Sequence, residues 1–336
     1  MNSTSDNTSK GFKNSINQHA KLRVYTILIA IIFIICVILA FLWNANQKTV
    51  QKARDNLGQL TLVGEMPVII KDGNIYEYTA DELWNKIEYT GEAKQIVRGE
   101  ELCVLNKDGS LYYEKDIVLS SEVLPLTSAY HLYMETKVLE LNKEEPFVCI
   151  NQNLDLVNFR ALLQSGDIIY QASDKYERYQ MAEETPVFLS GSYILTAEGN
   201  VYYLHTDTDG SSGIVKVNLK CEYDGGDIVA ISASETAARC LLLRKNGKVI
   251  SLSDIEPLKV SNWENLVSIE QGFNYAVGLT DKGEVLYVDY NTNSTEAVTK
   301  KLKTWTDVIQ IASYSDTIVG RKNDGSCYIL NLSDFK

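Results

Sequence analysis

Histidine is scarce in this chain, and several common catalytic motifs are missing. Beyond residue 43 only His131 and His205 remain. Two imidazoles argue against a metal site built from several histidines and limit any serine–histidine–aspartate arrangement to these positions. The chain also lacks HExxH, GxSxG, GxGxxG, CxxC and phosphate-loop motifs. The sequence therefore predicts no cofactor and favours binding over catalysis.

Cysteine is also sparse, with six residues in the whole chain. Cys36 lies in an apolar run, and the other five are irregularly spaced within apolar stretches such as "ELCVL" and "ARCLLL". An odd number without regular spacing does not form a disulfide framework. The sequence predicts buried thiols that pack as small apolar side chains. A single disulfide between repeats remains open.

Basic residues are outnumbered, 32 to 44, which gives a net charge of −12. Residues 1–23 carry +3 and residues 24–43 are uncharged, so the rest of the chain carries −15. A surface this acidic repels phosphate backbones. The sequence predicts no nucleic-acid partner.

One apolar segment, "VYTILIAIIFIICVILAFLW", fills residues 24–43. At about 1.5 Å per residue, a helix of this length crosses the roughly 30 Å hydrocarbon layer. Tyr25 and Trp43 stand at its two ends, where aromatic rings favour the membrane interface. The alternative is a cleaved signal peptide, but the exit "AFLWNANQ" has bulky residues where a cleavage site needs small ones. The sequence predicts an uncleaved anchor.

The charges flanking this segment predict its orientation. Four cations precede it and three follow it within a similar distance: Lys10, Lys13, Lys21 and Arg23, then Lys48, Lys52 and Arg54. This bias favours a cytoplasmic N-terminus. We expect a disordered cytoplasmic tail over 1–23, a transmembrane helix over 24–43, a juxtamembrane stalk over 44–60 and an extracytoplasmic domain over 61–336. The localisation predicted is the cell membrane, with a single pass.

The remaining chain contains a repeat of about forty residues. "WENLVSIEQGFNYAVGLTDKGEVLYV" (263–288) aligns without a gap to "WTDVIQIASYSDTIVGRKNDGSCYIL" (305–330). Seven segments share its centre, in which two β-rich runs flank a polar turn with glycine. Glycine adopts the positive φ that a tight hairpin demands. The seven predicted turn glycines are Gly73, Gly109, Gly166, Gly199, Gly247, Gly283 and Gly325.

Strand repeats of this length are typical of β-propellers. The predicted fold is therefore all-β, a propeller of about seven four-stranded blades over 61–336, preceded by one transmembrane helix. A two-sheet sandwich remains open for part of the chain. The segment "PFVCINQNLDLVNF" (146–159) is interpreted as a further strand pair, either an eighth blade or an outer hairpin.

The repeat resembles that of the regulator-of-chromosome-condensation propellers, especially their divergent bacterial relatives. Trp263, Val267, Ile269, Gly272, Leu279, Gly283 and Val285 fill the positions of that family's pattern. Tyr275 stands where the family often has histidine, and the closing W-G-x-N-x-x-G-Q is absent. The resemblance implies a propeller fold, and the acidic chain argues against nucleotide exchange or chromatin binding.

Closure of the ring sets a further expectation. Only eleven residues follow Gly325, too few for the outer strands of a four-stranded blade. We expect a strand from 59–70 to pair into the blade that contains Trp305, so that both ends of the domain latch the ring.

Candidate binding residues are Tyr275, Tyr314 and Asp316, in segments that the resemblance places near one end of the axial channel. Aromatic rings on loops of a rigid scaffold are favoured at protein-binding surfaces. The alternative is that these rings span blade edges. Trp263 and Trp305 recur with the repeat and are predicted to be core residues.

The loop "HTDTDGSSG" (205–213) is the one segment with ligand-like spacing. Asp207 and Asp209 could serve as metal ligands, in the manner of a calcium loop. The alternative is a polar turn between strands.

The sequence favours a single-pass membrane protein whose propeller binds a protein or a cell-envelope component. An alternative is a carbohydrate-active hydrolase or lyase whose carboxylates converge from distant loops. A third is a spacer or assembly module.

Overall fold

The chain divides into two units, Met1–Lys48 and Thr49–Lys336. The computed structural model describes Ile34, Ile35 and Val37, which are helical, and residues 60–97, 102–113, 142–151, 159–172, 175–182, 184–208, 215–234, 239–253, 257–289 and 292–335. The predicted tail, the predicted stalk before Leu60 and most of the predicted span lie outside the described residues. None of the helices within those ranges has the length and apolar content required to cross a membrane.

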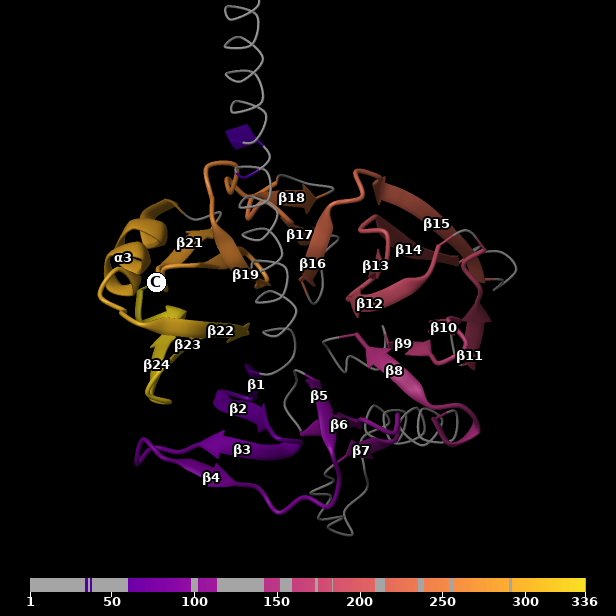
Figure 1. Ribbon diagram of the computed structural model, residues 1–336, viewed down its shortest axis with the longest axis horizontal. Helices are drawn as coiled ribbons and strands as arrows, with labels where there is room; N and C mark the ends of the chain where they lie inside the picture. Colours follow the sequence, from indigo (N-terminus) through magenta and orange to yellow (C-terminus); the bar gives the residue numbers. More distant parts are fainter. Residues whose placement is uncertain are drawn as a thin grey trace, which may run out of the picture. The chain divides into compact units, whose positions relative to one another are not determined.

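The second unit forms seven antiparallel sheets arranged in a ring, within the described residues (Figure 1). We number these sheets as blades 1 to 7 in chain order. Blade 1 contains β1 (Leu60–Val63), β2 (Met66–Lys71), β3 (Asn74–Tyr78) and β4 (Trp84–Lys86). Blade 2 contains β5 (Ala93–Val97), β6 (Cys103–Asn106) and β7 (Leu111–Tyr113). Blade 3 contains β8 (Phe147–Ile150), β9 (Arg160–Leu163), β10 (Ile168–Ala172) and β11 (Lys175–Tyr179).

Blades 4 to 7 complete the ring, and the first strand of every blade is its innermost. Blade 4 contains β12 (Pro186–Ser190), β13 (Tyr193–Thr196), β14 (Val201–Thr208) and β15 (Val215–Tyr223). Blade 5 contains β16 (Ile228–Ala233), β17 (Arg239–Arg244) and β18 (Val249–Ser253). Blade 6 contains β19 (Leu266–Gln271), β20 (Tyr275–Thr280) and β21 (Val285–Asp289), followed by α3 (Thr292–Leu302). Blade 7 contains β22 (Val308–Tyr314), β23 (Thr317–Lys322) and β24 (Cys327–Asn331), followed by a 3₁₀ helix, η1 (Leu332–Phe335).

The predicted turn glycines all join the second and third strands of a blade, and all have φ between 76° and 92°. At Gly283 the amide donates to the carbonyl of Thr280, and Thr280 donates to Glu284. This is the three-residue hairpin in which a turn is followed by a residue of positive φ. Gly73 differs, because Asp72 also has positive φ, which is the two-residue type I′ turn.

At four interfaces these turns also tie one blade to the next. The carbonyl of a turn glycine accepts the amide of the first residue in the following inner strand. This bond joins Gly73 to Ala93 at 2.8 Å, Gly109 to Phe147 at 3.1 Å, Gly199 to Ile228 at 3.1 Å and Gly247 to Leu266 at 2.9 Å. Pro186 begins the inner strand of blade 4 and has no amide hydrogen to donate to Gly166.

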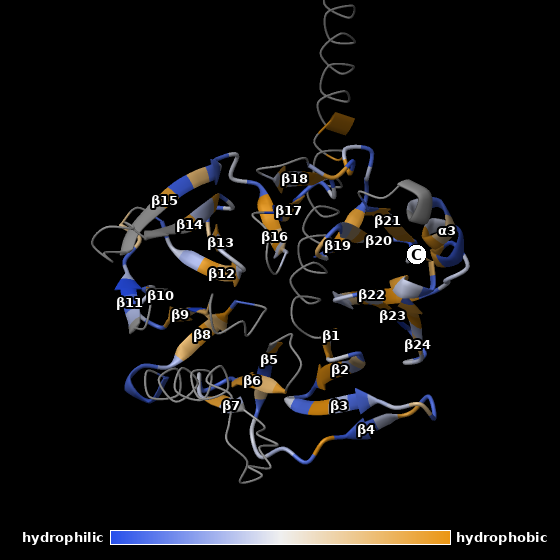
Figure 2. Cartoon of the chain, turned by 180° about the vertical axis from the view of Figure 1, so that it is seen from behind, coloured by the Kyte–Doolittle hydropathy of each residue, from blue (hydrophilic) through white to orange (hydrophobic). Residues whose placement is uncertain are grey.

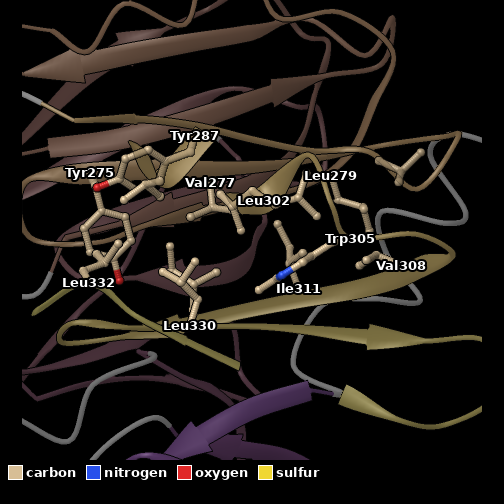
Figure 3. Packing of buried hydrophobic residues seen from close by; sticks show 14 residues of the cluster. Tyr275, Val277, Leu279, Tyr287, Leu302, Trp305, Val308, Ile311, Leu330 and Leu332 are labelled. Carbon is tan, nitrogen blue, oxygen red and sulfur yellow. The ribbon is translucent and has the colours of Figure 1, made fainter. Parts of the chain in front are cut away.

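Apolar side chains pack between blades, so the ring has seven small cores, one for each pair of neighbours. Figure 2 shows the apolar residues concentrated on the strands. The largest core joins blades 6 and 7, where Val277 and Leu279 face Ile311 and Leu330 (Figure 3). Each Leu-sized side chain contributes about 1.5–3 kcal/mol when fully buried. A hairpin unstable by itself is thus stabilised by its neighbours.

The tryptophans that mark the repeat are buried, as predicted, with 6% of Trp263 and of Trp305 exposed. Each ring lies against a glycine of its own blade. A Cβ at Gly278 would lie 3.0 Å from the Trp263 ring, and one at Gly320 would lie 2.7 Å from the Trp305 ring. The tryptophan and the glycine therefore recur together because they are one packing unit.

The prediction of four strands in every blade is wrong in detail. Blades 1, 3 and 4 have four strands, whereas the other blades have three within the described residues. The outer position is filled in other ways. In blade 6, α3 follows β21 and buries Val298 and Leu302 in the core between blades 6 and 7. In blade 5, Leu258 and Val260 are buried after β18 without forming a strand.

The predicted latch strand is also wrong. β1 pairs with β2 inside blade 1, and blade 7 is built from C-terminal residues alone. Side chains close the ring instead. Leu60 and Leu62 of β1 pack against Ala312 and Val319 of blade 7. The remaining segment of uncertain role, 146–159, contains β8, the inner strand of blade 3.

A tryptophan completes this closure. The Trp84 indole Nε1 donates to the carbonyl oxygen of Gly325 at 2.5 Å. At the four interfaces described above, the carbonyl of the turn glycine accepts a backbone amide of the next blade instead of a side-chain donor. The last glycine turn is thus bound by a side chain of β4, 241 residues away in the sequence.

Candidate functional site

The candidate site is a pocket between blades 4 and 5, on the end of the propeller that carries the glycine turns. We call this end the glycine-turn face. The pocket has a volume of about 370 Å³. Sites that bind small molecules or side chains begin at about 300 Å³. Its lining residues are Val187, Phe188, Leu195, Thr196, Ala197, Gly199, Ile228, Val229 and Lys245.

Irregular strand pairing shapes the wall of this pocket. The register between β12 and β13 shifts between Pro186 and Phe188, which leaves Val187 as an extra residue. A similar shift between Ile228 and Ala230 leaves Val229 as an extra residue in β16. Bulges redirect side chains out of the regular alternation. Val187 is 46% exposed although it belongs to an inner strand, whereas Val229 is only 4% exposed.

Beside the pocket, Glu184 lies just before β12, the first strand of blade 4. It accepts hydrogen bonds from Thr196 Oγ1 at 2.6 Å, Tyr202 OH at 2.7 Å and Asn200 Nδ2 at 2.9 Å. Partial burial acts to raise the pKa of Glu184, but these three bonds outweigh it and hold the pKa below its ordinary value. The hydrogen bond to Glu184 is also the main reason that the pKa of Tyr202 is raised. Glu184 is thus engaged in structure.

A second acidic group, Asp227, is engaged in the same way at the entry to blade 5. Its carboxylate accepts from Arg244 Nε at 2.8 Å and from Tyr223 OH at 2.6 Å. The hydrogen bond with Asp227 is the largest cause that raises the pKa of Arg244, and likewise of Tyr223.

Lys245 is the charged residue of the pocket lining. It is exposed, and its Nζ donates to the carbonyl oxygen of Gly226 at 3.2 Å. Among the described residues, no carboxylate lies within ion-pair distance of Lys245. The pocket therefore combines apolar walls with a positive charge, and its lining contains no carboxylate. The alternative of a hydrolase gains no support from this pocket.

Of the three candidate binding residues, Tyr275 is buried, with 4% of its surface exposed. Its ring stacks on Tyr287 with 5.8 Å between the centroids, and its hydroxyl donates to the carbonyl of Ser315 at 3.0 Å. Tyr314 is partly buried against the core that joins blades 7 and 1. The carbonyl of Asp316 accepts the amide of Leu332 at 2.7 Å. Tyr275 and Asp316 thus help to fix the loops and the C-terminus of blade 7.

The candidate metal ligands are separated from this region of blade 7. Asp207 lies in β14, where its backbone is opposite Lys216 of β15. Asp209 lies outside the described residues. In the part of the chain that the structure describes, no three His, Cys, Asp or Glu residues are grouped as a metal would require.

Two of the predicted buried thiols are completely enclosed. Burial raises the pKa of Cys149 to about 11 and raises that of Cys240 as well. Cys221, by contrast, is exposed on β15. Buried thiols of raised pKa are chemically inert and serve packing.

Sequence reasoning missed the pocket because bulges leave no linear motif. A signal was nevertheless present. "TPVFL" and "DIVAI", which begin blades 4 and 5, each contain a continuous apolar run where strict alternation would place polar residues between apolar ones. Such a break in period 2 is what a bulge produces.

No family model matches the chain, and a comparison with curated proteins found no match. Among solved structures the chain has partial similarity to the following. Yeast RCC1 (Prp20) bound to Kap60 has a TM-score of 0.48 and 11% identity, with 71% of each chain covered. Prp20p from Saccharomyces cerevisiae gives 0.46 and 12%, with 71% of this chain and 73% of that chain covered. The CRINKLY WD40 ectodomain of the Arabidopsis thaliana receptor kinase ACR4 gives 0.48 and 11%, with coverage of 81% and 93%. At this similarity these structures indicate neither a family nor a partner. The chain is a β-propeller by its own seven sheets.

Proposed function

We propose that this protein is a binding module whose propeller holds a protein partner on the glycine-turn face. The carrying observation is the pocket between blades 4 and 5, which has apolar walls, a partly exposed Val187 and a lysine without a carboxylate partner among the described residues. Protein-binding sites combine apolar anchor pockets with a polar rim. Loops on a rigid scaffold can supply both.

We further propose that the propeller is tethered to the cell membrane by residues 24–43 and lies outside the cytoplasm. The support is the uncharged run of twenty residues and the excess of cations before it. A partner would then be another envelope protein or a component exposed there.

The test is affinity capture from detergent-solubilised membranes, with the full chain as bait. Wild type and the Val187→Asp variant are compared by quantitative mass spectrometry. We expect a protein that the wild type recovers and the variant loses, because a carboxylate in the apolar wall opposes burial of a partner's side chain. The Lys71→Glu variant is the control, since Lys71 is exposed two residues before the turn glycine of blade 1, as Lys245 is in blade 5. Equal recovery of all proteins by wild type and Val187→Asp would contradict the proposal.

A further inference from the structure

We propose that the partner presents an aliphatic side chain with a carboxylate close to it. The aliphatic side chain enters the pocket between blades 4 and 5, and the carboxylate binds Lys245. This inference rests on the proposed function and specifies what is recognised at that site.

The walls of the pocket select an aliphatic side chain. Val187 and Phe188 come from β12, Leu195 from β13, and Ile228 and Val229 from β16. The side-chain hydroxyl of the lining, that of Thr196, already donates to Glu184 at 2.6 Å and accepts the backbone amide of Asn200 at 3.2 Å. A polar side chain placed against the apolar part of the wall would lose its water without gaining a hydrogen bond from it, which is unfavourable.

The charges around the pocket select a carboxylate. The two neighbouring acids are engaged, Glu184 by three hydrogen bonds and Asp227 by Arg244 and Tyr223. Lys245 contacts only a neutral carbonyl in the described contacts. Glu198, exposed on the glycine turn of blade 4, is the nearby charge that opposes an incoming acid. An acidic group placed beside Lys245 therefore gains a charge-assisted hydrogen bond.

Equivalent turns do not offer the same combination. The corresponding lysine of blade 2, Lys107, pairs with Glu92 at 3.1 Å. In blades 6 and 7 the corresponding residues are Asp281 and Asn323. Lys71 of blade 1 is exposed but does not line this pocket. The pairing of an apolar pocket with a lysine is thus a feature of blade 5 that the repeat does not impose.

The probe is a phage library of random peptides, selected on the full chain held in detergent micelles. We expect enriched peptides to share a Leu, Ile or Val with an Asp or Glu close to it in the sequence. Affinities of the selected peptides are then measured on purified variants whose melting temperatures match wild type.

Two substitutions address the two parts of the site. Val187→Asp should weaken binding by at least about tenfold, because the apolar anchor loses its wall. Lys245→Glu should weaken binding of the acidic peptides by about tenfold and favour versions in which the acid is replaced by lysine. Lys71→Glu, the matched charge reversal on blade 1, should leave all affinities unchanged.

The outcomes separate this inference from the proposed function. Enriched peptides without the apolar–acidic pattern, or peptides indifferent to both substitutions, would overturn the inference while leaving a protein-binding propeller in place. Failure to enrich any peptide, combined with equal capture of membrane proteins by wild type and Val187→Asp, would overturn both. A charge preference that reverses with Lys245→Glu would establish the contact with Lys245.

Discussion

Single residues decide how closely neighbouring blades approach, and the glycine turns show this most clearly. All seven have positive φ, yet their surroundings differ. A Cβ at Gly283 would lie 2.9 Å from the backbone oxygen of Val308 in the next blade. A Cβ at Gly166 would meet nothing within 4 Å. Glycine is therefore required at position 166 only for its backbone conformation, whereas at position 283 it is required for both conformation and space.

This contrast yields a prediction about substitution by alanine. Gly166→Ala should lower the free energy of unfolding by about 1 kcal/mol, the cost of a Cβ at positive φ. Gly283→Ala should cost about 1–3 kcal/mol more, because the backbone of Val308 must also move. Urea denaturation followed by circular dichroism measures both. Equal losses for the two variants would show that the contact with blade 7 is not tight.

Glu184 yields a prediction about pH. Its pKa in the folded protein is below the ordinary value of 4.5 because Thr196, Tyr202 and Asn200 donate to it. The folded state thus favours the ionised form, and this stabilisation is present above about pH 4.5 and is lost as the pH falls through the folded pKa. Glu184→Gln cannot titrate. We expect the difference in melting temperature between wild type and Glu184→Gln to shrink on acidification through this range.

A second variant checks the cause of that pH dependence. Tyr202→Phe removes one of the three donors to Glu184. Its melting temperature should therefore exceed that of Glu184→Gln by less than wild type does, in the same pH range. A difference between wild type and Glu184→Gln that stays constant from neutral to acidic pH would refute the assignment.

The residue patterns that sequence reasoning recovered are those that repeat. Trp263 with Gly278 and Trp305 with Gly320 recur at one spacing because each ring needs the space that its glycine leaves. A contact that occurs once, such as Trp84 with Gly325, has no second copy for comparison. The same holds for Glu184, which precedes β12 and comes close to its donors only when β12 pairs with β13. Contacts that do not repeat could therefore not be predicted from the sequence.

At the scale of elements, hairpins were predictable but outer strands were not. The inner three strands of a blade follow from alternation and the glycine turn. The outer position needs only to cover apolar side chains, and it is filled by β4 in blade 1, by α3 in blade 6 and by an irregular segment in blade 5. Counting residues after Gly325 failed for this reason. Among the described residues, blade 7 has three strands followed by η1, and no strand from the other end of the domain pairs with them.

Ring closure yields the prediction at this scale. Trp84→Phe keeps most of the apolar contact with Tyr78 and the core between blades 7 and 1 but removes the donor to Gly325. We expect a loss of about 1 kcal/mol in the free energy of unfolding, since the partly buried carbonyl of Gly325 is left without this partner. Hydrogen exchange should show faster opening in β24 and β4 than in blades 3 and 4.

The neighbouring residue supplies the control for this prediction. Leu83 is 61% exposed, so Leu83→Ala should change stability by less than about 0.5 kcal/mol. Equal exchange rates in all blades of Trp84→Phe would show that side-chain packing alone closes the ring.

At the scale of the whole molecule, the composition of the chain distinguishes the propeller from the uncharged apolar run over residues 24–43. The propeller satisfies its backbone groups in seven sheets and buries its apolar residues between blades. Residues 24–43 have no charge or alternation with which to join such a structure. We propose that this run avoids water by crossing a bilayer as a helix, because a helix satisfies its own backbone there.

We therefore expect residues 24–43 to hold the protein in the membrane, with the propeller outside the cytoplasm. Sodium carbonate extraction should leave the full chain in the membrane pellet, whereas a chain lacking residues 1–43 should be released. Protease added to intact cells should remove an epitope placed after Lys336 and spare one placed at residue 1, because the excess of cations before the span favours a cytoplasmic N-terminus. Disruption of the cells before protease treatment is the control and should expose both epitopes. Release of the full chain by carbonate would refute the anchor, and digestion of the N-terminal epitope alone would reverse the orientation.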